Sequence, residues 1–416
     1  MTTHLVVIGA GIVGAATALE ALGAGFRVTI LEPGEPGGEQ AASYGNGCWL
    51  SPMSVIPPAG PGLWKKIPRF LMDPLGPLAI RWSYLPRAAP WLVKYLLAGW
   101  TEAKVEAAAR ALRPLLVGAP ALHKALAERA GVGHLIEQRG LIYTYENRGQ
   151  FESEAMAWRI RRKVGIEWLE LDADAMRQRE PELDRRYTFG ALVEEGGHCR
   201  DPGRYVAALV AQAVAEGAEL KRAAATGFRI EAGRLRAVTI EGGEVAADKA
   251  VICAGAHSRK LAAAAGSPVP LETERGYHAM FPDAEAGPRT PMMPYDGKMS
   301  ITWTDRGLRC AGQVEIAGLE AAPNWKRAEI LRDHLLRSFP NLKPGEVKVW
   351  MGHRPSMPDG LPCLGPSAAS HDVLLGFGHG HVGLVGGPRS AQVLLCMLAE
   401  RVPPIPVEPF LPSRFA

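Results

Sequence analysis

A glycine-rich segment near the N-terminus places the strongest constraint on how this 416-residue chain can fold. An apolar run, Leu5 to Ile8, meets Gly9, Gly11 and Gly14, and a helical face of small and apolar residues follows. A second apolar run then ends at Glu32. Strand, tight turn, helix and strand in this order form the unit that binds a dinucleotide.

Each glycine of this unit has its own physical role. Gly9 allows the tight turn, Gly11 lets the backbone approach a pyrophosphate, and Gly14 lets the helix pack closely on the strand. The phosphates then meet the free N–H groups of the helix N-terminus. Glu32 can accept hydrogen bonds from ribose hydroxyls, and its charge repels a 2′-phosphate, which disfavours NADP. The unit does not separate NAD from FAD, and a glycine turn that serves only packing is the alternative.

Length and composition define the class of protein. The chain is long enough for two domains, which need not be consecutive in sequence. The hydrophobic content of 47% and the charged content of 22% are typical of a soluble globular protein. No apolar run is long enough to cross a bilayer and the first residues contain no export signal, so we expect a cytoplasmic location. The net charge of +4 and the six scattered cysteines predict neither a nucleic-acid partner nor a metal site.

A polar, glycine-rich loop follows Glu32. Ser43, Asn46 and Gly47 lie in this loop, where they can contact the remainder of a dinucleotide through side-chain and backbone donors. A nicotinamide enzyme seldom needs such a second loop. The alternative is an ordinary connector between two elements.

Residues 57–100 combine repeated prolines with four tryptophans and several basic residues. One interpretation is a proline-broken lobe that packs over the main sheet. The other is a patch at a membrane surface, because Trp and Lys or Arg beside leucine-rich turns are typical of the interfacial region. Both interpretations can hold together. The membrane hypothesis rests on Trp64, Lys65, Lys66, Trp82 and Trp91.

Proline and capping patterns predict helices in the middle of the chain. The helical region at residues 102–130 is expected to divide at Pro114 and at Pro120. Asp201 is a good N-cap for a later helix with an alanine-rich face, and Gly217 closes that helix.

The last third of the chain contains the remaining strand and helix patterns. Strand-like segments and an amphipathic helix, Trp325 to Ser338, occupy residues 271–348 and predict a second, sheet-based domain. Near the C-terminus a strand, Val373 to Gly376, runs into several glycines, and we expect a helix from about Pro388. This second strand-to-helix junction also suits the polar edge of a cofactor.

Seven motifs then occur in the order found in one enzyme family. They are VVIGAGIVG with Glu32, ASYGNGCWLSP, GHCRDPGRYVAAL, AVICAGAHS, ERGYH, GHRPSMPDGLPCLGP and GFGHGHVGLVGGP. On these motifs the chain resembles, over nearly its whole length, the D-amino-acid oxidase family of FAD enzymes. It is most similar to the bacterial D-amino-acid dehydrogenase branch, which includes D-hydroxyproline dehydrogenases.

The resemblance implies an α/β fold of the glutathione-reductase and D-amino-acid oxidase (DAO) type. A Rossmann-like FAD-binding domain, discontinuous in sequence, would consist of residues 1–56, 197–270 and 350–416. A sheet-based substrate-binding or cap domain would consist of residues 57–196 and 271–349.

The resemblance also implies which residues hold FAD. The ADP half would be held by Gly9, Gly11, Gly14, Glu32 and Pro33, with Ala225 at the adenine and Gly255 behind the central sheet. Ser43, Asn46 and Gly47 would lie along the pyrophosphate and flavin. The isoalloxazine ring would be surrounded by Gly378, His379, Gly380, Val382, Gly383 and Leu384. Ala225 is placed at the end of the strand before a hairpin. Sarcosine-oxidase relatives attach flavin through a cysteine where this chain has Gly352 and His353, so we expect non-covalent FAD.

Two residues are the leading catalytic candidates. Arg354 matches the family's arginine that grips the substrate carboxylate, and a guanidinium fork suits this role because it donates two parallel hydrogen bonds. Tyr277 is expected to donate to the same carboxylate or to close the pocket, with an ordinary half-buried strand tyrosine as the alternative. The weaker candidates are Arg275, His278, His353 and Tyr295.

The implied reaction is oxidative deamination of D-amino acids, with D-proline or hydroxyproline among the substrate types. Hydride transfer from Cα to flavin N5 would give an imino acid, which water hydrolyses to a keto acid and ammonia. We name no side-chain base. Electrons would pass to quinone if the Trp-rich lobe contacts the inner membrane peripherally, and to oxygen or a soluble carrier otherwise. The alternatives are an oxygen-dependent glycine or sarcosine oxidase and a flavin-containing subunit of a larger amine dehydrogenase.

Overall fold

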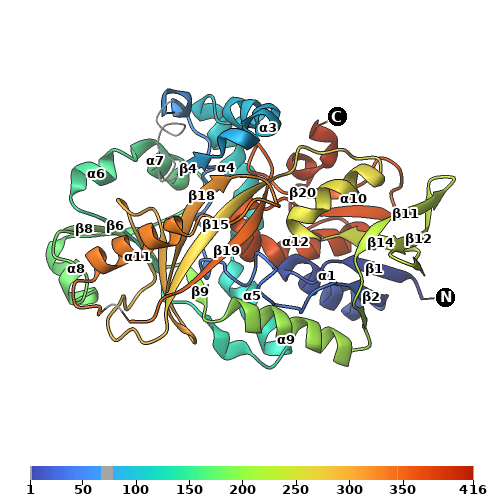
Figure 1. Ribbon diagram of the computed structural model, residues 1–416, viewed down its shortest axis with the longest axis horizontal. Helices are drawn as coiled ribbons and strands as arrows, with labels where there is room; N and C mark the ends of the chain where they lie inside the picture. The colour runs from blue at the N-terminus through green and yellow to red at the C-terminus, as the bar shows by residue number, and fades with distance from the viewer. Residues whose placement is uncertain (1, 67–77, 344, 416) are drawn as a thin grey trace.

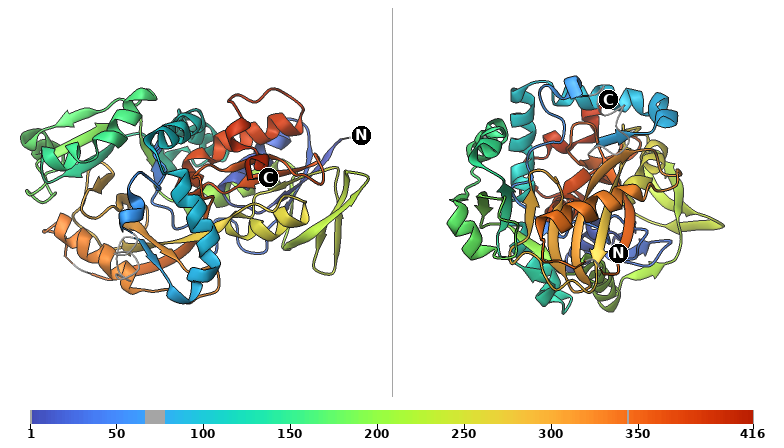
Figure 2. Two further views of the ribbon diagram at one scale, coloured as in Figure 1. Left: turned by 90° about the horizontal axis from the view of Figure 1, so that it is seen from above. Right: turned by 60° about the vertical axis from the view of Figure 1, so that its left-hand side comes forward.

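Two lobes, each organised around its own β-sheet, lie side by side along the long axis of the molecule in the computed structural model (Figure 1, Figure 2). The structure describes residues 2–66, 78–343 and 345–415. The six-stranded lobe has the strand order β10-β2-β1-β14-β21-β20, in which every pair is parallel except the last. Its strands are β10 (Glu219–Lys221), β2 (Arg27–Leu31), β1 (His4–Ile8), β14 (Lys249–Ile252), β21 (Val373–Phe377) and β20 (Cys363–Pro366).

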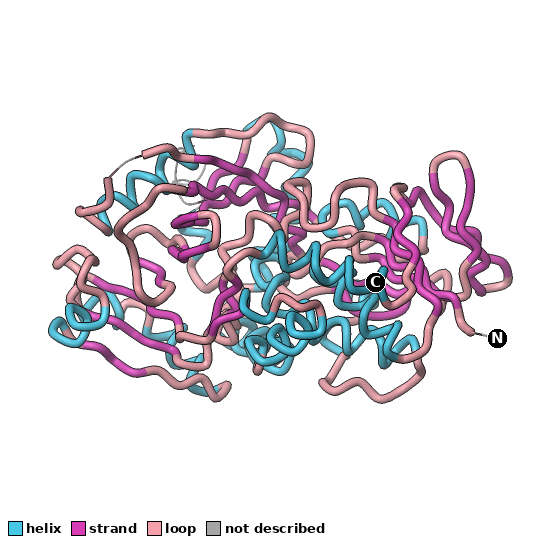
Figure 3. Tube along the Cα trace, turned by 90° about the horizontal axis from the view of Figure 1, so that it is seen from below, coloured by secondary structure: helices cyan, strands magenta, loops and turns pink. Residues whose placement is uncertain are grey.

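The strand β1 contributes to two separate cores, because successive side chains of a strand point to opposite faces. Leu5 and Val7 pack on one face, whereas Val6 and Ile8 pack on the other. The first face is covered by the helices α1 (Ile12–Gly23), α5 (Ala119–Arg129), α9 (Pro202–Ala215) and α12 (Gly383–Leu398). The second face is covered by α10 (Ser258–Ala264) and by a three-stranded sheet, β11 (Ala225–Glu231), β12 (Arg234–Ile240) and β13 (Gly243–Ala246), which lies at the same end as the N-terminus (Figure 3). A mainly parallel sheet buried on both faces confirms the predicted α/β class.

The nine-stranded lobe is built on a largely antiparallel sheet. Its strands are β19 (Lys348–Ser356), β15 (Glu272–Phe281), β18 (Gly307–Ile316), β17 (Ser300–Thr304), β16 (Met292–Pro294), β6 (Leu141–Tyr145), β8 (Phe189–Val193) and β7 (Leu169–Leu171), with β4 (Leu78–Ile80) beside β18. The helix α11 (Lys326–Ser338) packs on β15 and β18, and its residues Leu331 and Leu335 are fully buried in this lobe's core. The helix predicted at Trp325 to Ser338 is thus present, with its start at Lys326.

Further elements lie outside the two large sheets. They are a small sheet of β3 (Trp49–Leu50), β9 (Gly197–Cys199) and β5 (Ile136–Glu137), and the helices α3 (Leu85–Ala98), α4 (Glu102–Leu116), α6 (Arg148–Glu152), α7 (Ala155–Lys163) and α8 (Ala173–Arg179). The helices α4 and α5 pack on α12, so residues 102–129 share the core of the six-stranded lobe although they were expected in the cap domain. The expected boundary at residue 350 falls inside β19, which pairs with β15.

The helix ends confirm one local prediction and correct another. Asp201 caps α9, because its Oδ1 atom accepts a hydrogen bond of 3.0 Å from the Arg204 N–H. Pro120 lies in the first turn of α5, as expected, but Pro114 lies inside α4 rather than at a break. Burial of Leu115 and Leu116 against the six-stranded lobe keeps this last turn helical despite the hydrogen bond that proline removes.

The predicted start of the last helix at Pro388 is wrong, because α12 begins five residues earlier, at Gly383, and contains this proline. A proline inside a helix has no N–H for the carbonyl four residues before it, which here is Leu384. The buried side chain of His123 supplies the missing donor, since its Nε2 atom lies 2.8 Å from the Leu384 oxygen. A side chain of α5 thus replaces the backbone hydrogen bond that Pro388 removes.

The tryptophans of residues 57–100 have different environments. Trp64 and Trp82 have exposed fractions of 48% and 64%, whereas Trp91 is 5% exposed and stacks on Tyr95. Trp91 therefore packs inside the lobe and does not contribute to a surface patch, which corrects the membrane hypothesis. Part of the Trp-rich lobe, residues 67–77, lies outside the described residues. Within the described ranges, no helix combines the length and the apolarity that crossing a membrane requires.

Candidate active site

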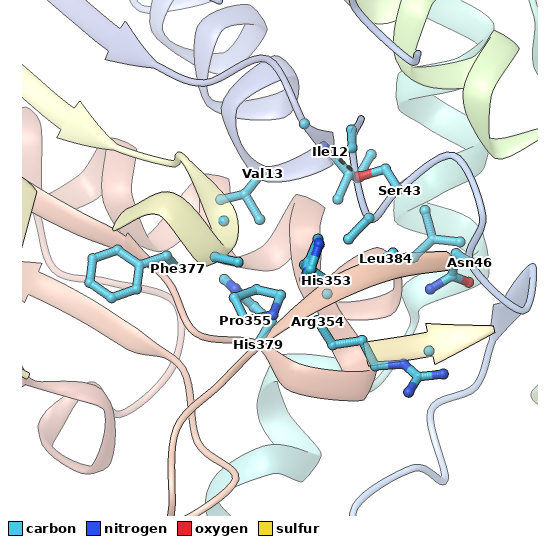
Figure 4. A pocket seen from close by; sticks show the side chains of 18 of the residues that line it. Ile12, Val13, Ser43, Asn46, His353, Arg354, Pro355, Phe377, His379 and Leu384 are labelled. Carbon is cyan, nitrogen blue, oxygen red and sulfur yellow. Dashed lines mark hydrogen bonds between the residues drawn. The ribbon is translucent and has the colours of Figure 1, made fainter. Parts of the chain in front are cut away.

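A cavity of about 1000 Å³ runs between the two lobes (Figure 4). Its lining comes from the glycine turn after β1, the loop after β2, the start of β11, the end of β14, the facing strands β15, β18 and β19, and the N-terminus of α12. Segments from both ends of the chain thus meet around one space. This volume lies at the upper end of the usual range for ligand pockets.

The glycine turn forms one end of the cavity. Gly9 has a φ of +100°, and a Cβ atom on it would lie 2.6 Å from the Cys253 oxygen. A Cβ atom on Gly14 would overlap the Gly9 oxygen, so this glycine lets α1 approach β1, as the sequence predicted. Gly11 lines the cavity and is the N-cap of α1, without a side-chain capping bond. The Ile12 N–H at the start of α1 donates to the Ser43 Oγ atom, and the N–H groups that follow it in the first turn can meet an anion.

The Glu32 carboxylate is fixed across this turn. Its Oε2 atom accepts a hydrogen bond of 2.9 Å from the Ala10 N–H, and its Oε1 atom accepts one of 2.9 Å from the Gly34 N–H. Both oxygens keep a lone pair for a further donor, such as a ribose hydroxyl. Pro33, Gly255 and Ala225 also line the cavity. Ala225 was expected to end a strand, but it is the first residue of β11.

The loop after β2 forms one wall of the middle of the cavity, where Ser43, Asn46 and Gly47 all contribute to the lining. The Ser43 Oγ atom accepts a hydrogen bond of 3.2 Å from the Ile12 N–H (Figure 4). The Asn46 Oδ1 atom accepts from the Cys48 N–H at 2.9 Å, which leaves the amide NH₂ as a donor.

Arg309, which sequence reasoning missed, fixes this loop to the nine-stranded lobe. Its side chain is buried, and its Nη1 atom donates to the backbone oxygens of Tyr44 and Asn46 at 3.1 and 3.0 Å. An arginine on a central strand is a signal for such a role, because a buried guanidinium needs several acceptors.

The C-terminal glycine segment forms the opposite wall. His379, Gly380, Gly383 and Leu384 line the cavity, whereas Gly378 and Val382, named with them from the sequence, do not. Gly378 packs under Met357, and Val382 is buried with an exposed fraction of 5%.

His379 is neutral in this wall. Burial lowers its pKa to about 4, and its Nε2 atom lies 2.8 Å from the Ser390 hydroxyl.

Arg354 lies in the part of the cavity formed by the nine-stranded lobe. Its Nη1 and Nη2 atoms donate to the backbone oxygens of Gln313 and Gly312 at 2.8 and 3.3 Å. Figure 4 shows the guanidinium extending toward the Asn46 side of the cavity, away from Phe377. Burial lowers the pKa of Arg354 and the Glu274 charge opposes this change, while an arginine remains protonated at any working pH.

The strands beside Arg354 are shaped to receive its side chain. A Cβ atom on Gly276 of β15 would overlap the Arg354 guanidinium, so only glycine leaves room there. Gln313 of β18 has a φ of +61°, and the pairing register shifts at this point, as in a β-bulge. A non-glycine residue in this conformation is strained, and here its carbonyl is one of the two that hold Arg354.

The structure does not bring Tyr277 to the cavity. Strand alternation gives the reason: Gly276 lines the cavity, so Tyr277 points to the opposite face of β15. Its hydroxyl donates to Glu315 Oε2 at 2.5 Å and accepts from the Asn324 N–H at 3.0 Å, and its exposed fraction is 1%. Arg275 lies on the same buried face and donates to the Gly318 oxygen.

Of the other weaker candidates, only one lines the cavity. His353 does so, with its Nδ1 atom 3.1 Å from the Thr273 hydroxyl, and burial lowers its pKa to about 4. His278 stacks on Trp350, and Tyr295 contacts Ser153.

Sequence reasoning missed Glu274, the strand neighbour of Arg354, and its hydrogen-bond partner His381. Glu274 is buried, and its Oε2 atom accepts hydrogen bonds from the Ser356 hydroxyl at 3.0 Å and from His381 Nε2 at 2.9 Å. Burial raises the pKa of Glu274, but the hydrogen bonds of His381 and Ser356 and the charge of Arg354 outweigh this effect, so the net shift is downward. The signal was present in the ERGYH motif, where Glu274 has the same parity as Gly276.

Comparisons with known proteins agree with this site. The family model DAO, described as FAD dependent oxidoreductase, matches residues 4–397. The chain therefore belongs to the DAO family of FAD-dependent oxidoreductases, as its motifs predicted. It is 60% identical over 416 residues to a D-amino-acid oxidase of Bradyrhizobium diazoefficiens, covering 99% of each chain. It is 28% identical over 422 residues to a D-amino acid dehydrogenase of Xanthobacter autotrophicus, again covering 99% of each.

Solved structures share the fold at low sequence identity. A glycine oxidase from Geobacillus kaustophilus superposes with a TM-score of 0.74 at 20% identity and covers 100% of both chains. An L-proline dehydrogenase from P. horikoshii superposes with a TM-score of 0.73 at 19% identity, covering 100% of this chain and 98% of that one. These likenesses show the architecture of the two lobes.

The residues present fit FAD. The glycine turn, the Glu32 carboxylate and the start of α1 match an ADP group, and the N-terminus of α12 faces the far part of the cavity. Among the described residues, no group of side chains could hold a metal ion.

Proposed function

We propose that this protein oxidises D-amino acids to imino acids with FAD held non-covalently in the cavity. The observation that carries the proposal is Arg354, a cation inside a largely apolar cavity and opposite the dinucleotide end. Two of its N–H groups are held by backbone carbonyls, and the rest of the guanidinium can receive a carboxylate. The 60% identity to a D-amino-acid oxidase supports a D-amino acid as the source of that carboxylate.

Non-covalent FAD is supported by the chemistry of the lining. Among the described lining residues the one cysteine is Cys253, and burial raises its pKa to about 12. A thiol that stays protonated is a poor nucleophile. Gly352 and His353 occupy the position where a cysteine would be needed for a covalent link.

The chain's own residues would act mainly by orientation. Arg354 would bind the substrate carboxylate through two parallel hydrogen bonds and fix the position of the α-carbon. Bound FAD would supply the acceptor for the hydride that leaves Cα, after which water hydrolyses the imino acid to a keto acid and ammonia. The N-terminus of α12 would favour negative charge nearby through its helix dipole.

For the electron acceptor, two candidates have separate support. Oxygen is supported by the relative at 60% identity, whose name is D-amino-acid oxidase. Quinone is supported by the dehydrogenase relatives and by exposed tryptophans on the Trp-rich lobe. A glycine or sarcosine oxidase is the alternative for the substrate.

An amino-acid panel under anaerobic conditions tests the proposal. D-amino acids, including D-proline and D-hydroxyproline, should bleach the flavin absorbance, whereas their L-enantiomers, glycine and sarcosine should not. Bleaching by glycine or sarcosine alone would contradict the D-amino-acid assignment. Adding oxygen or a quinone to the reduced protein then identifies the acceptor, because only the oxygen reaction yields hydrogen peroxide.

We also propose a peripheral membrane contact through the Trp-rich lobe. Trp64, Trp82 and Trp100 have exposed fractions of 48%, 64% and 51%, Trp64 stacks on Trp100, and the Lys65 ammonium lies 5.6 Å from the Trp64 ring. Exposed Trp beside Lys suits the interface of an anionic bilayer.

Sedimentation with anionic vesicles at low salt tests this contact. The wild-type protein should pellet with the vesicles, and the double variant Trp64→Ala/Trp82→Ala should remain in the supernatant. Trp325→Ala is the matched control, because Trp325 is 44% exposed at the start of α11 and lies outside the Trp-rich lobe. A wild-type protein that fails to pellet would exclude the membrane contact.

A further inference from the structure

A buried carboxylate connects Arg354 to a second side chain of the cavity. Glu274 of β15 is 3% exposed and is the register partner of Arg354 on β19, so the two side chains lie on the same face of the sheet. The Glu274 carboxylate is also the hydrogen-bond partner of His381, at 2.9 Å. Glu274 is therefore the strand neighbour of Arg354 and the hydrogen-bond partner of His381.

His381 presents its second nitrogen without a partner. It belongs to the short turn before α12, lines the cavity, and has a side chain that is 40% exposed. Because a carboxylate can only accept, the Nε2 atom of a neutral ring carries the proton and Nδ1 carries the lone pair. In the described part of the chain, no side chain or backbone group is hydrogen-bonded to Nδ1. The remaining lone pair is thus free to take a proton.

A bound amino acid brings an ammonium group next to its carboxylate. With the carboxylate on Arg354, the ammonium is attached to the adjacent carbon and lies in the cavity that His381 also lines. The Glu274 carboxylate, whose pKa is lowered, lies behind His381 and contacts its ring. An ammonium must lose a proton before its nitrogen can donate a lone pair to the forming C=N bond.

We propose that His381, held by Glu274, accepts the proton that the substrate ammonium loses before its Cα–H bond breaks. This inference rests on the proposed oxidation of amino acids. One N–H bond of the ammonium breaks, and its electron pair stays on the nitrogen as the amine lone pair. An N–H bond forms at Nδ1, giving an imidazolium next to the Glu274 carboxylate, and the proton later passes to solvent. The arrangement follows the logic of a base oriented by a carboxylate.

The surrounding groups are compatible with this role. From the sheet, the Glu274 carboxylate favours an imidazolium at His381, and the positive charge of Arg354 near Glu274 disfavours it. From α3, the buried Tyr95 lies near Glu274, and burial raises the pKa of its hydroxyl, so it stays neutral. On the turn of His381 itself, His379 is neutral, because burial lowers its pKa to about 4. Glu274 is therefore the anion in direct contact with the ring.

The rate of anaerobic flavin reduction by a D-amino acid, measured from pH 6 to 10, tests the proposal. The variant His381→Asn should reduce its flavin roughly 100-fold more slowly than wild type at neutral pH, which is the usual range for a general base. This difference should shrink as pH rises and the substrate amine loses its proton unaided. A profile parallel to that of wild type would overturn the proposal, because a merely structural defect lowers the rate equally at each pH.

Two further measurements separate the role of the base from that of Arg354. Imidazole added to His381→Gly should restore part of the rate if the missing group is a proton acceptor. Propionate, which has a carboxylate but no amine, should perturb the flavin spectrum of His381→Asn with the affinity found for wild type. Loss of propionate binding would show that His381 holds the carboxylate site instead, and would also overturn the proposal.

Glu274→Gln tests the positioning part. Without the adjacent carboxylate an imidazolium is less stable, so the acidic limb of the pH profile should move to lower pH. An unmoved limb would remove Glu274 from the assignment.

The matched control is His371→Asn, an exposed histidine outside the cavity, whose profile should equal that of wild type. If no amino acid reduces wild type, the proposed function fails and this role with it, whereas reduction of wild type with an unchanged His381→Asn profile rejects this role alone.

Discussion

At the residue scale, Gly276 and Arg354 explain each other. The Arg354 side chain lies over β15 at Gly276, which has no Cβ atom, and two backbone oxygens hold its guanidinium. The strained Gln313 supplies one of these oxygens. The arginine is thus pre-positioned, so its order does not have to be created when a carboxylate binds.

Removing Arg354 should affect substrate binding and leave the cofactor in place. We expect Arg354→Ala to raise KM for an amino acid by at least about 100-fold, because a charge-assisted bidentate pair is lost. The ratio of FAD to protein should stay at the wild-type value. Steady-state kinetics and the absorbance spectrum measure the two quantities, and an unchanged KM would remove Arg354 from the substrate site.

Adding one carbon at Gly276 should have a related effect without removing any charge. The new methyl group of Gly276→Ala would overlap the guanidinium and displace it, so we expect KM to rise by about tenfold or more. Gly243→Ala is the control, because a Cβ atom on Gly243 of β13 meets no atom within 4 Å. Equal kinetics for the two variants would contradict the packing argument.

At the element scale, the start of α12 depends on a side chain of α5. Pro388 leaves the Leu384 carbonyl without its helical donor, and His123 replaces that donor while its Nδ1 atom lies 3.0 Å from the Tyr205 hydroxyl. Leu384 also lines the cavity. The geometry of the cofactor wall is therefore coupled to a contact on the far side of the helix.

Replacing His123 should weaken the fold at this point. His123→Leu leaves the buried Leu384 oxygen without its side-chain donor and leaves the Tyr205 hydroxyl only its 3.4 Å hydrogen bond to the backbone oxygen of residue 123. We therefore expect the free energy of unfolding to fall by about 2 kcal/mol. The dissociation constant for FAD should rise, because Leu384 contributes to the cavity wall. Chemical denaturation and FAD titration measure these changes. The exposed His371→Leu should change neither, and a His123→Leu protein as stable as wild type would contradict the coupling.

At the scale of the whole molecule, several buried histidines link stability to pH. Burial lowers the pKa of three of them, His123, His198 and His379, to about 4, from an ordinary value of 6.5. Between these two values the unfolded chain binds more protons than the folded protein, so the free energy of unfolding falls as pH decreases from 6.5 to 4. The loss is absent above pH 6.5, where the histidines are neutral in both states.

Denaturation curves at pH 7 and pH 4.5 should show this loss of stability. His123 alone contributes up to about 3 kcal/mol across the full interval, by the conversion of a pKa difference to free energy. The variant His123→Leu should therefore lose less stability than wild type between these two pH values. A free energy of unfolding that rises on acidification would refute the assignment of these side chains as neutral and buried.

The sequence predicted the two sheets and much of the cofactor cavity, because each depends on local patterns. Glycine spacing with an acid, period-two strands and the capping of α9 by Asp201 are properties of a few adjacent residues. The departures come from contacts between distant elements. Whether Gly276 or Tyr277 lines the cavity depends on which face of the strand is turned toward it. The helix that contains Pro388 depends on the hydrogen bond from His123. The pair of Glu274 and His381 joins two segments that are 107 residues apart in sequence.

In sequence, the residues that line the cavity run from Ile8 to Val385. During synthesis, the glycine turn leaves the ribosome long before β21 and the start of α12 exist. The strand β14, which lies between β1 and β21, also comes more than two hundred residues after β1 in sequence. FAD can therefore complete its contacts only after nearly the whole chain has been released, so cofactor loading is expected to be a late, post-translational event.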